Sequence, residues 1–158
     1  MQNLLDLIQK EIISFFTTIK NEKWFGKERE IISRFAFSNL LDLVNADARF
    51  YSPGQIGIEV RVKQIDDSGK KEVCKDLVVW KFPYQTAWSQ DNSPLLIVEW
   101  KCNNKNIFKG DADWLEEYVR QNPATIGIAV NIDNKGEYSL KAALIENGKP
   151  VDMEWINL

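Results

Sequence analysis

The sequence predicts a single α/β domain in which helices pack against a mixed sheet. Two segments at the start have the three-to-four-residue period of helices, and three strand-like segments follow them. A short helical segment then precedes a further buried strand, as in α/β folds. The length of 158 residues suits one hydrophobic core, so we assign residues 1–158 to one domain.

Two helices are predicted in the first 44 residues. Over residues 3–20 the apolar side chains recur as they do on the buried face of a helix. Residues 21–26 break this period, and residues 27–44 resume it. The first turn of the second predicted helix therefore contains two acidic residues, Glu28 and Glu30.

Three strands are expected next. After a turn at residues 52–54, apolar and polar residues alternate strictly, which is typical of a half-exposed strand. The side chains expected on its apolar face are those of Ile56, Ile58, Val60 and Val62. A second strand is predicted over residues 73–80, a long loop over 81–94, and an apolar strand suited to the centre of a sheet over 95–101.

The remaining elements complete the order α-α-β-β-β-α-β-β. A short helix is predicted over residues 111–121, where acidic residues at its start suit the helix dipole. Pro123 ends it, and strands follow over residues 124–132 and 137–145. Residues 148–158 show no clear pattern.

Composition excludes several kinds of chemistry. The chain has no histidine, which rules out Ser-His-Asp triads and histidine-ligated zinc. Cys74 and Cys102 lack metal-ligand spacing and are expected to be buried thiols in a reducing cytosol. No apolar run is long enough to span a bilayer, so we expect a cytoplasmic protein without membrane contact. The net charge of −3 counts against broad, sequence-blind nucleic-acid binding.

Charged residues appear at the end of the apolar strand over residues 95–101. Glu99 and Lys101 are two residues apart, so they share one face of the strand and Trp100 points to the other. Asp76 lies at the start of the preceding strand. If these strands are antiparallel neighbours, Asp76 lies beside Glu99 and Lys101. Two carboxylates and a lysine would then converge on one point.

This residue set suits a hydrolase that uses Mg²⁺ or Mn²⁺. Mg²⁺ is usually held by one or two carboxylates together with water and substrate phosphate. The ion would lower the pKa of a bound water and neutralise charge in the transition state. Lys101 would orient the attacking water and stabilise the developing negative charge.

The segments Lys75–Trp80 and Ile97–Lys101 resemble motifs II and III of the PD-(D/E)xK, restriction-endonuclease-like nucleases. The resemblance covers roughly residues 25–132. It implies a restriction-endonuclease-like sandwich with a mixed central sheet, an αβββαβ core and an extra N-terminal helix. It also implies that Asp76 and Glu99 bind the metal, that the backbone carbonyl of Trp100 completes the metal shell, and that Lys101 is catalytic. Lys75 replaces the proline of the family name, at a position that varies in such proteins.

The family often adds an acid from the preceding helix, for which Glu28 and Glu30 are the candidates. Glu28 shares a helix face with Ile31, Ile32 and Phe35, whereas Glu30 lies nearly opposite. We therefore prefer Glu28 as the fourth catalytic residue. The alternative for both is a helix start rich in acids because of the dipole.

The predicted function is hydrolysis of phosphodiester bonds in DNA, with RNA as the less favoured substrate. Because no separate DNA-reading domain is visible, the chain is expected to act as a homodimer or with a targeting partner. Trp88 in the long loop is a candidate for stacking on a base. The main alternative is an inactive domain of the same fold that serves as a binding or regulatory module. A second alternative is an unrelated α/β protein in which Glu99 and Lys101 form a surface ion pair.

Overall fold

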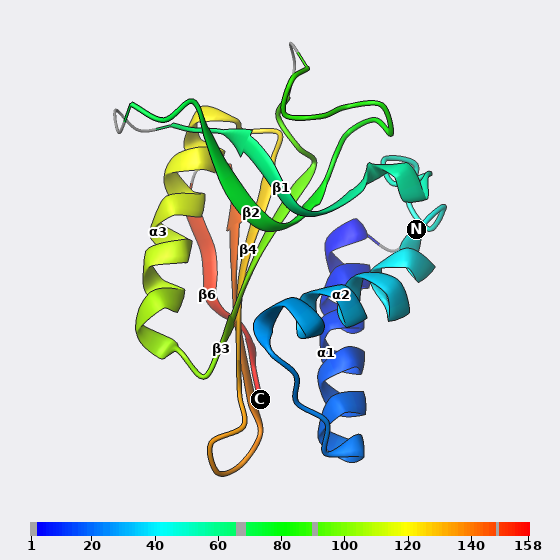
Figure 1. The fold of residues 1–158 in the computed structure, drawn as a ribbon, viewed down its shortest axis with the longest axis vertical. Helices are drawn as coiled ribbons and strands as arrows, with labels where there is room; N and C mark the ends of the chain where they lie inside the picture. The colour runs from blue at the N-terminus through cyan, green and yellow to red at the C-terminus, as the bar shows by residue number, and fades with distance from the viewer. Residues whose placement is uncertain (1–2, 66–68, 90–91, 148) are drawn as a thin grey trace.

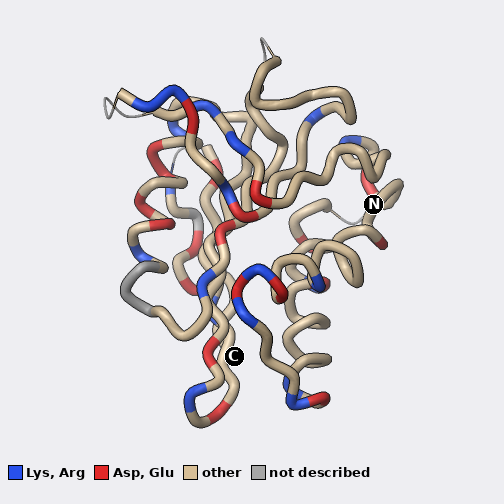
Figure 2. Tube along the Cα trace, viewed as in Figure 1, with Lys and Arg blue, Asp and Glu red and all other residues tan. Residues whose placement is uncertain are grey.

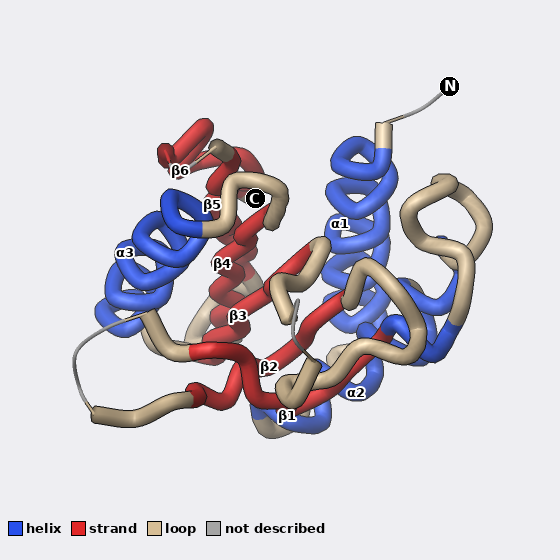
Figure 3. The backbone as a smooth tube through the Cα atoms, turned by 90° about the horizontal axis from the view of Figure 1, so that it is seen from above, coloured by secondary structure: helices blue, strands red, loops and turns tan. Residues whose placement is uncertain are grey.

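A computed structural model describes residues 3–65, 69–89, 92–147 and 149–158. In these residues three α-helices cover the two faces of a six-stranded sheet. Figure 1 shows α3 (Lys105–Gln121) on one face, with α1 (Leu4–Glu22) and α2 (Glu28–Ser38) on the other. The view from above in Figure 3 separates the same three layers. The predicted α/β class with a mixed sheet is confirmed.

The strands lie in the sheet in the order in which they occur in the chain. Their bounds are β1 (Ile56–Lys63), β2 (Glu72–Val79), β3 (Leu96–Cys102), β4 (Ile126–Asp133), β5 (Ser139–Glu146) and β6 (Lys149–Asn157). Neighbours are antiparallel except for β3 and β4, which are parallel. A parallel pair needs a crossover connection, and α3 provides it. The tail, for which the sequence indicated no element, adds β6.

The second helix is shorter than the sequence predicts. α2 ends at Ser38, and a 3₁₀ turn over Leu40–Leu43 continues the apolar pattern. Between them, Asn39 Nδ2 donates a hydrogen bond to a Glu11 carboxylate oxygen of α1 at 2.9 Å. The period of apolar residues does not distinguish one long helix from a helix followed by such a turn. None of the described helices is both long and apolar enough to cross a bilayer.

α3 is longer than the sequence predicts, because it begins at Lys105 rather than at residue 111. Just before the helix starts, the Asn104 N–H donates a hydrogen bond to the Asn131 side-chain oxygen on β4, at 3.2 Å. Asp111 therefore lies inside the helix. The helix dipole therefore does not explain why an acidic residue occurs at this position. The interpretation of Asp111 as part of an acidic helix start is wrong.

Each face of the sheet has its own hydrophobic core. Beneath α1 and α2, the Trp100 indole packs against Phe15 and Phe35, with ring-centroid distances of 6.0 and 5.1 Å. On the opposite face, Leu115 of α3 and Trp80 belong to the second core. Trp80 and Trp100 are both buried, as expected for tryptophans that pack on a sheet.

The apolar side of β1 changes partway along the strand. Ile56 and Ile58 pack against the core beneath α1 and α2, whereas Val60 and Val62 belong to the core beneath α3. Between them the backbone of Glu59 has a φ of 52°, in the left-handed region that side chains other than glycine rarely adopt. The prediction that these four apolar residues share one face is therefore wrong.

β2 changes faces at the opposite position, Asp76. Val73 packs beneath α3, whereas Leu77 and Val79 pack beneath α1 and α2. The pairing of β2 with β3 covers only Leu77 to Val79. Within the described residues, the segment of β2 from Glu72 to Asp76 thus has no strand partner on its β3 side, and Asp76 marks the point where the two strands separate.

Candidate active site

Ionisable side chains from four elements meet where β2 and β3 separate. The central group is the ammonium of Lys101 on β3. Its Nζ lies 3.7 Å from Asp76 Oδ2 of β2 and 3.6 Å from Glu28 Oε1 of α2. It also lies 3.4 Å from Asp111 Oδ2 of α3. One cation therefore contacts three carboxylates, and Figure 2 shows charged positions at the start of α2 close to those on the strands.

The backbone of Trp100 takes part in this cluster on both sides. Its N–H donates a hydrogen bond to Asp76 Oδ2 at 2.8 Å, and its carbonyl accepts one from Lys101 Nζ at 2.8 Å. The Trp100 side chain points into the opposite core, as alternation along a strand requires. The Asp76 carboxylate is thus fixed by the β3 backbone at the point where the pairing of the strands stops.

Glu99 lies beside Asp76 but has a cation of its own. It forms a buried ion pair with Lys75 of β2, in which the two side chains are only 5% and 7% exposed. Lys75 Nζ also lies 3.5 Å from the ring centroid of Trp114 on α3, a cation–π contact. The structure therefore brings Asp76, Glu99 and Lys101 together and adds Lys75 to the group.

Burial sets the protonation of Glu99. Desolvation raises the pKa of its carboxyl group to about 8, with the positive charge of Lys75 opposing the rise and the negative charge of Asp76 adding to it. A carboxylate in this position is therefore costly in the absence of a further positive charge.

Glu28 and Asp111 show the same deficit of positive charge. Desolvation raises the pKa of Glu28 and of Asp111, and the attraction of Lys101 only partly offsets it. The pKa of Lys101 is itself raised, because the surrounding carboxylates outweigh its own desolvation. With four carboxyl groups and two ammonium groups, the cluster favours the arrival of another cation.

The two acids at the start of α2 have different positions. Glu28 reaches the cluster through its contact with Lys101. The Glu30 carboxylate instead accepts a hydrogen bond from the Lys27 N–H at 2.7 Å, which caps the start of the helix. The geometry thus agrees with the choice of Glu28 as the inward acid.

The cluster offers oxygen ligands without forming a ready-made metal cage. Across the described stretches of the chain, no three acidic or cysteine side chains are arranged to hold a metal ion. Asp111 Oδ2, however, is buried, and apart from its ion pair with Lys101 it has no hydrogen-bond partner among the described residues. Carboxylate and carbonyl oxygens are the ligands preferred by Mg²⁺, so the donor set fits such an ion. Lys101 and Lys75 provide only part of the positive charge that the acids require.

Sequence reasoning missed the roles of Lys75 and Asp111. A lysine within the apolar segment of β2 was a signal, because burying an ammonium is costly without a partner. Asp111 precedes Leu115 by one helical turn and shares its face, and Leu115 is fully buried. That spacing would have indicated an inward acid, had the helix been predicted to start earlier.

The chain matches no protein-family model, and no curated protein is significantly similar to it. Function is therefore inferred from the geometry of this cluster and from the chemistry that its side chains permit.

Proposed function

We propose that the chain is a metal-dependent nuclease of the PD-(D/E)xK type that hydrolyses phosphodiester bonds, in DNA rather than RNA. One observation carries the proposal: Asp76, Glu99 and Lys101 converge at the point where β2 and β3 separate. Two carboxylates and an amine at one point are what metal-assisted phosphodiester hydrolysis needs.

The proposal gives each residue the role that the family resemblance implies and that its contacts permit. Asp76, Glu99 and the Trp100 carbonyl would hold Mg²⁺ or Mn²⁺, and Glu28 would add a fourth oxygen ligand. A bound ion of this kind supplies an activated water and neutralises charge on the phosphate. The Lys101 ammonium would position that water and stabilise negative charge on the phosphate oxygens, since it already contacts Asp76 and the Trp100 carbonyl.

Lys75 sets a condition on this mechanism. Glu99 must exchange its buried contact with Lys75 for one with the metal. The exchange is between two positive partners, so the Glu99 carboxylate need not become unpaired. Lys75 thus competes with the metal for Glu99.

The same ion pair favours a second function, that of an inactive binding or regulatory module. If Lys75 holds Glu99 permanently, the fold retains the cluster as a structural ion-pair network. The lack of a ready-made cage in the described residues agrees with this alternative. It predicts that no divalent ion binds in a way that depends on Asp76.

Two measurements separate these functions. The intact protein is incubated with single-stranded DNA, duplex DNA and RNA in the presence of Mg²⁺ or Mn²⁺, and Mn²⁺ binding is measured by calorimetry. The nuclease proposal expects cleavage of at least one substrate and Mn²⁺ binding that is lost in Asp76→Ala. Absence of both would leave the binding-module alternative in place.

A comparison of the two acids of α2 tests the assignment of Glu28. We expect Glu28→Gln to weaken Mn²⁺ binding about tenfold, because it removes the negative charge of the fourth proposed ligand. Glu30→Gln should leave Mn²⁺ affinity unchanged, because Glu30 caps the helix instead. Calorimetry on both variants gives the answer, and equal affinities would remove Glu28 from the site.

A further inference from the structure

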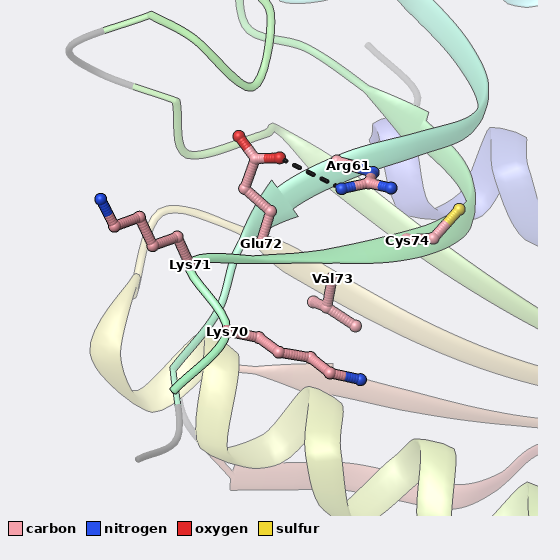
Figure 4. A pocket seen from close by; sticks show the side chains of 6 residues that line it. All are labelled: Arg61, Lys70, Lys71, Glu72, Val73 and Cys74. Carbon is pink, nitrogen blue, oxygen red and sulfur yellow. Dashed lines mark ion pairs between the residues drawn. The ribbon is translucent and has the colours of Figure 1, made fainter. Parts of the chain in front are cut away.

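A groove is lined by the first residues of β2, in the segment that does not pair with β3, and by neighbouring residues of the β1–β2 hairpin. Its volume is about 510 Å³. The lining consists of Arg61, Lys70, Lys71, Glu72, Val73 and Cys74. Figure 4 shows these side chains, with Lys70 and Lys71 extending in different directions from the start of β2.

The charge of this groove is opposite to that of the whole protein. The chain carries a net charge of −3, yet the groove has three cationic side chains and a single acid. That acid, Glu72, is already paired with Arg61, at a distance of 3.7 Å. Lys70 and Lys71 are both exposed to solvent. A local excess of exposed cations of this kind attracts phosphate groups.

The register of the hairpin places the groove next to the proposed catalytic residues. Arg61 pairs with Cys74 across the two strands. Cys74 precedes Asp76 by two residues, which corresponds to about 7 Å along a strand. A nucleic-acid strand with one phosphate beside Asp76 would therefore bring the following phosphates first to Arg61 and then to the two lysines, which precede Asp76 by five and six residues.

An exposed tryptophan lies at an adjoining hollow. This second hollow shares Arg61 and Glu72 with the first, and its other walls include Val60 and Trp88. The Trp88 side chain is on the long loop between β2 and β3 and is 87% exposed. Aromatic rings beside a basic groove are the usual platform on which unpaired bases stack.

We propose that the surface formed by Arg61, Lys70, Lys71 and Trp88 binds a single-stranded nucleic-acid segment and leads it to the Asp76 cluster. Trp88 favours a single strand because only an unpaired base offers a free face for stacking. The small number of cations also disfavours sequence-blind binding of a duplex, which relies on many phosphate contacts. The role in cleavage rests on the proposed nuclease function, whereas the binding itself is independent of it.

Binding is tested on the full chain in EDTA, where a metal-dependent enzyme cannot cut. Fluorescence anisotropy of a labelled oligothymidylate is compared with that of a duplex of equal length, over a series of salt concentrations. We expect tighter binding of the single strand. Trp88→Ala should weaken it by about 5- to 150-fold, the effect of losing one stacked base. The double variant Lys70→Ala/Lys71→Ala should reduce the slope of log affinity against log salt by about 1.4.

Tyr84→Ala is the matched control, because Tyr84 is 75% exposed on the same loop but does not line either hollow. It should bind like the native protein. The proposal fails if the oligonucleotide does not bind, if the duplex binds as tightly, or if Trp88→Ala behaves like Tyr84→Ala. If cleavage is unaffected by substitution of Trp88 or of the two lysines, the role of the groove in cleavage is overturned, but the nuclease function is not. Groove-dependent binding without cleavage under any metal would overturn the nuclease function alone.

Discussion

Asp76→Ala should abolish phosphodiester hydrolysis and Mn²⁺ binding together. The Asp76 carboxylate of β2 connects that strand to β3, because it accepts a hydrogen bond from the Trp100 N–H and lies 3.7 Å from Lys101 Nζ. Removing it deletes a proposed metal ligand and releases the β3 backbone at the point where the strands separate. We expect a fall in cleavage rate of about a thousandfold, the scale on which electrostatic groups of active sites act.

Lys101→Met provides the contrasting result that identifies the lysine as catalytic. The cleavage rate should fall by about 10²–10³ because the charge-stabilising group is lost. Mn²⁺ affinity should be equal or higher, since three carboxylates lose the ammonium that now contacts them. A loss of rate with retained metal binding is not expected if Lys101 serves only the fold.

Exposed residues provide controls for these two variants. Asp42→Ala removes an exposed acid from the 3₁₀ turn after α2, and Lys135→Met removes an exposed lysine between β4 and β5. Both should cleave at the native rate. Circular dichroism checks that each variant is folded. If the Asp76→Ala and Lys101→Met variants were folded and as active as these controls, the cluster would not be the catalytic site.

Much of this arrangement could be predicted from local patterns. The apolar run before Glu99 identified a central strand, and spacing by two residues put Glu99 and Lys101 on one face. Antiparallel pairing of β2 and β3 then brought Asp76 near them. These inferences succeed because strand alternation is a local property of the chain and because consecutive strands usually lie next to each other in a sheet.

The partner of Glu99 could not be predicted in this way. Strict alternation would place Lys75 on the same face as Leu77, beneath α1 and α2 and away from Glu99. β2 changes faces at Asp76, opposite the left-handed Glu59 of β1, and this change turns Lys75 toward Glu99. A change of face depends on how two strands twist together, so neither strand's sequence reveals it alone.

Lys75→Met is expected to destabilise the fold by about 3–5 kcal/mol at a pH above 8, where the native Glu99 is ionised; this is the usual cost of leaving one partner of a buried ion pair uncompensated. The Lys75 and Glu99 side chains are almost fully buried, so water cannot replace the lost contact. Chemical denaturation measures the loss. Lys63→Met, which removes an exposed lysine from β1, should leave stability nearly unchanged. The double variant Lys75→Met/Glu99→Gln should recover much of the loss, because it removes the unpaired charge.

The loss of folding stability in Lys75→Met should also depend on pH. Burial already raises the pKa of Glu99 above its ordinary value of 4.5, to about 8. The folded state therefore holds a proton that the unfolded state releases in this range, and stability falls as pH rises through it. Without Lys75 the pKa rises further, so both proteins lose stability alike up to about pH 8, and the difference between them should grow as pH rises above that value.

Metal addition to this variant tests whether Lys75 and the ion compete for one carboxylate. Mn²⁺ at pH 8 should raise the melting temperature of Lys75→Met more than that of the native protein, because the ion no longer has to displace the Lys75 ammonium. The stability loss of Lys75→Met could instead be independent of pH, and Mn²⁺ could raise its melting temperature no more than that of the native protein. Lys75 would then stabilise the fold only through its packing on Trp114.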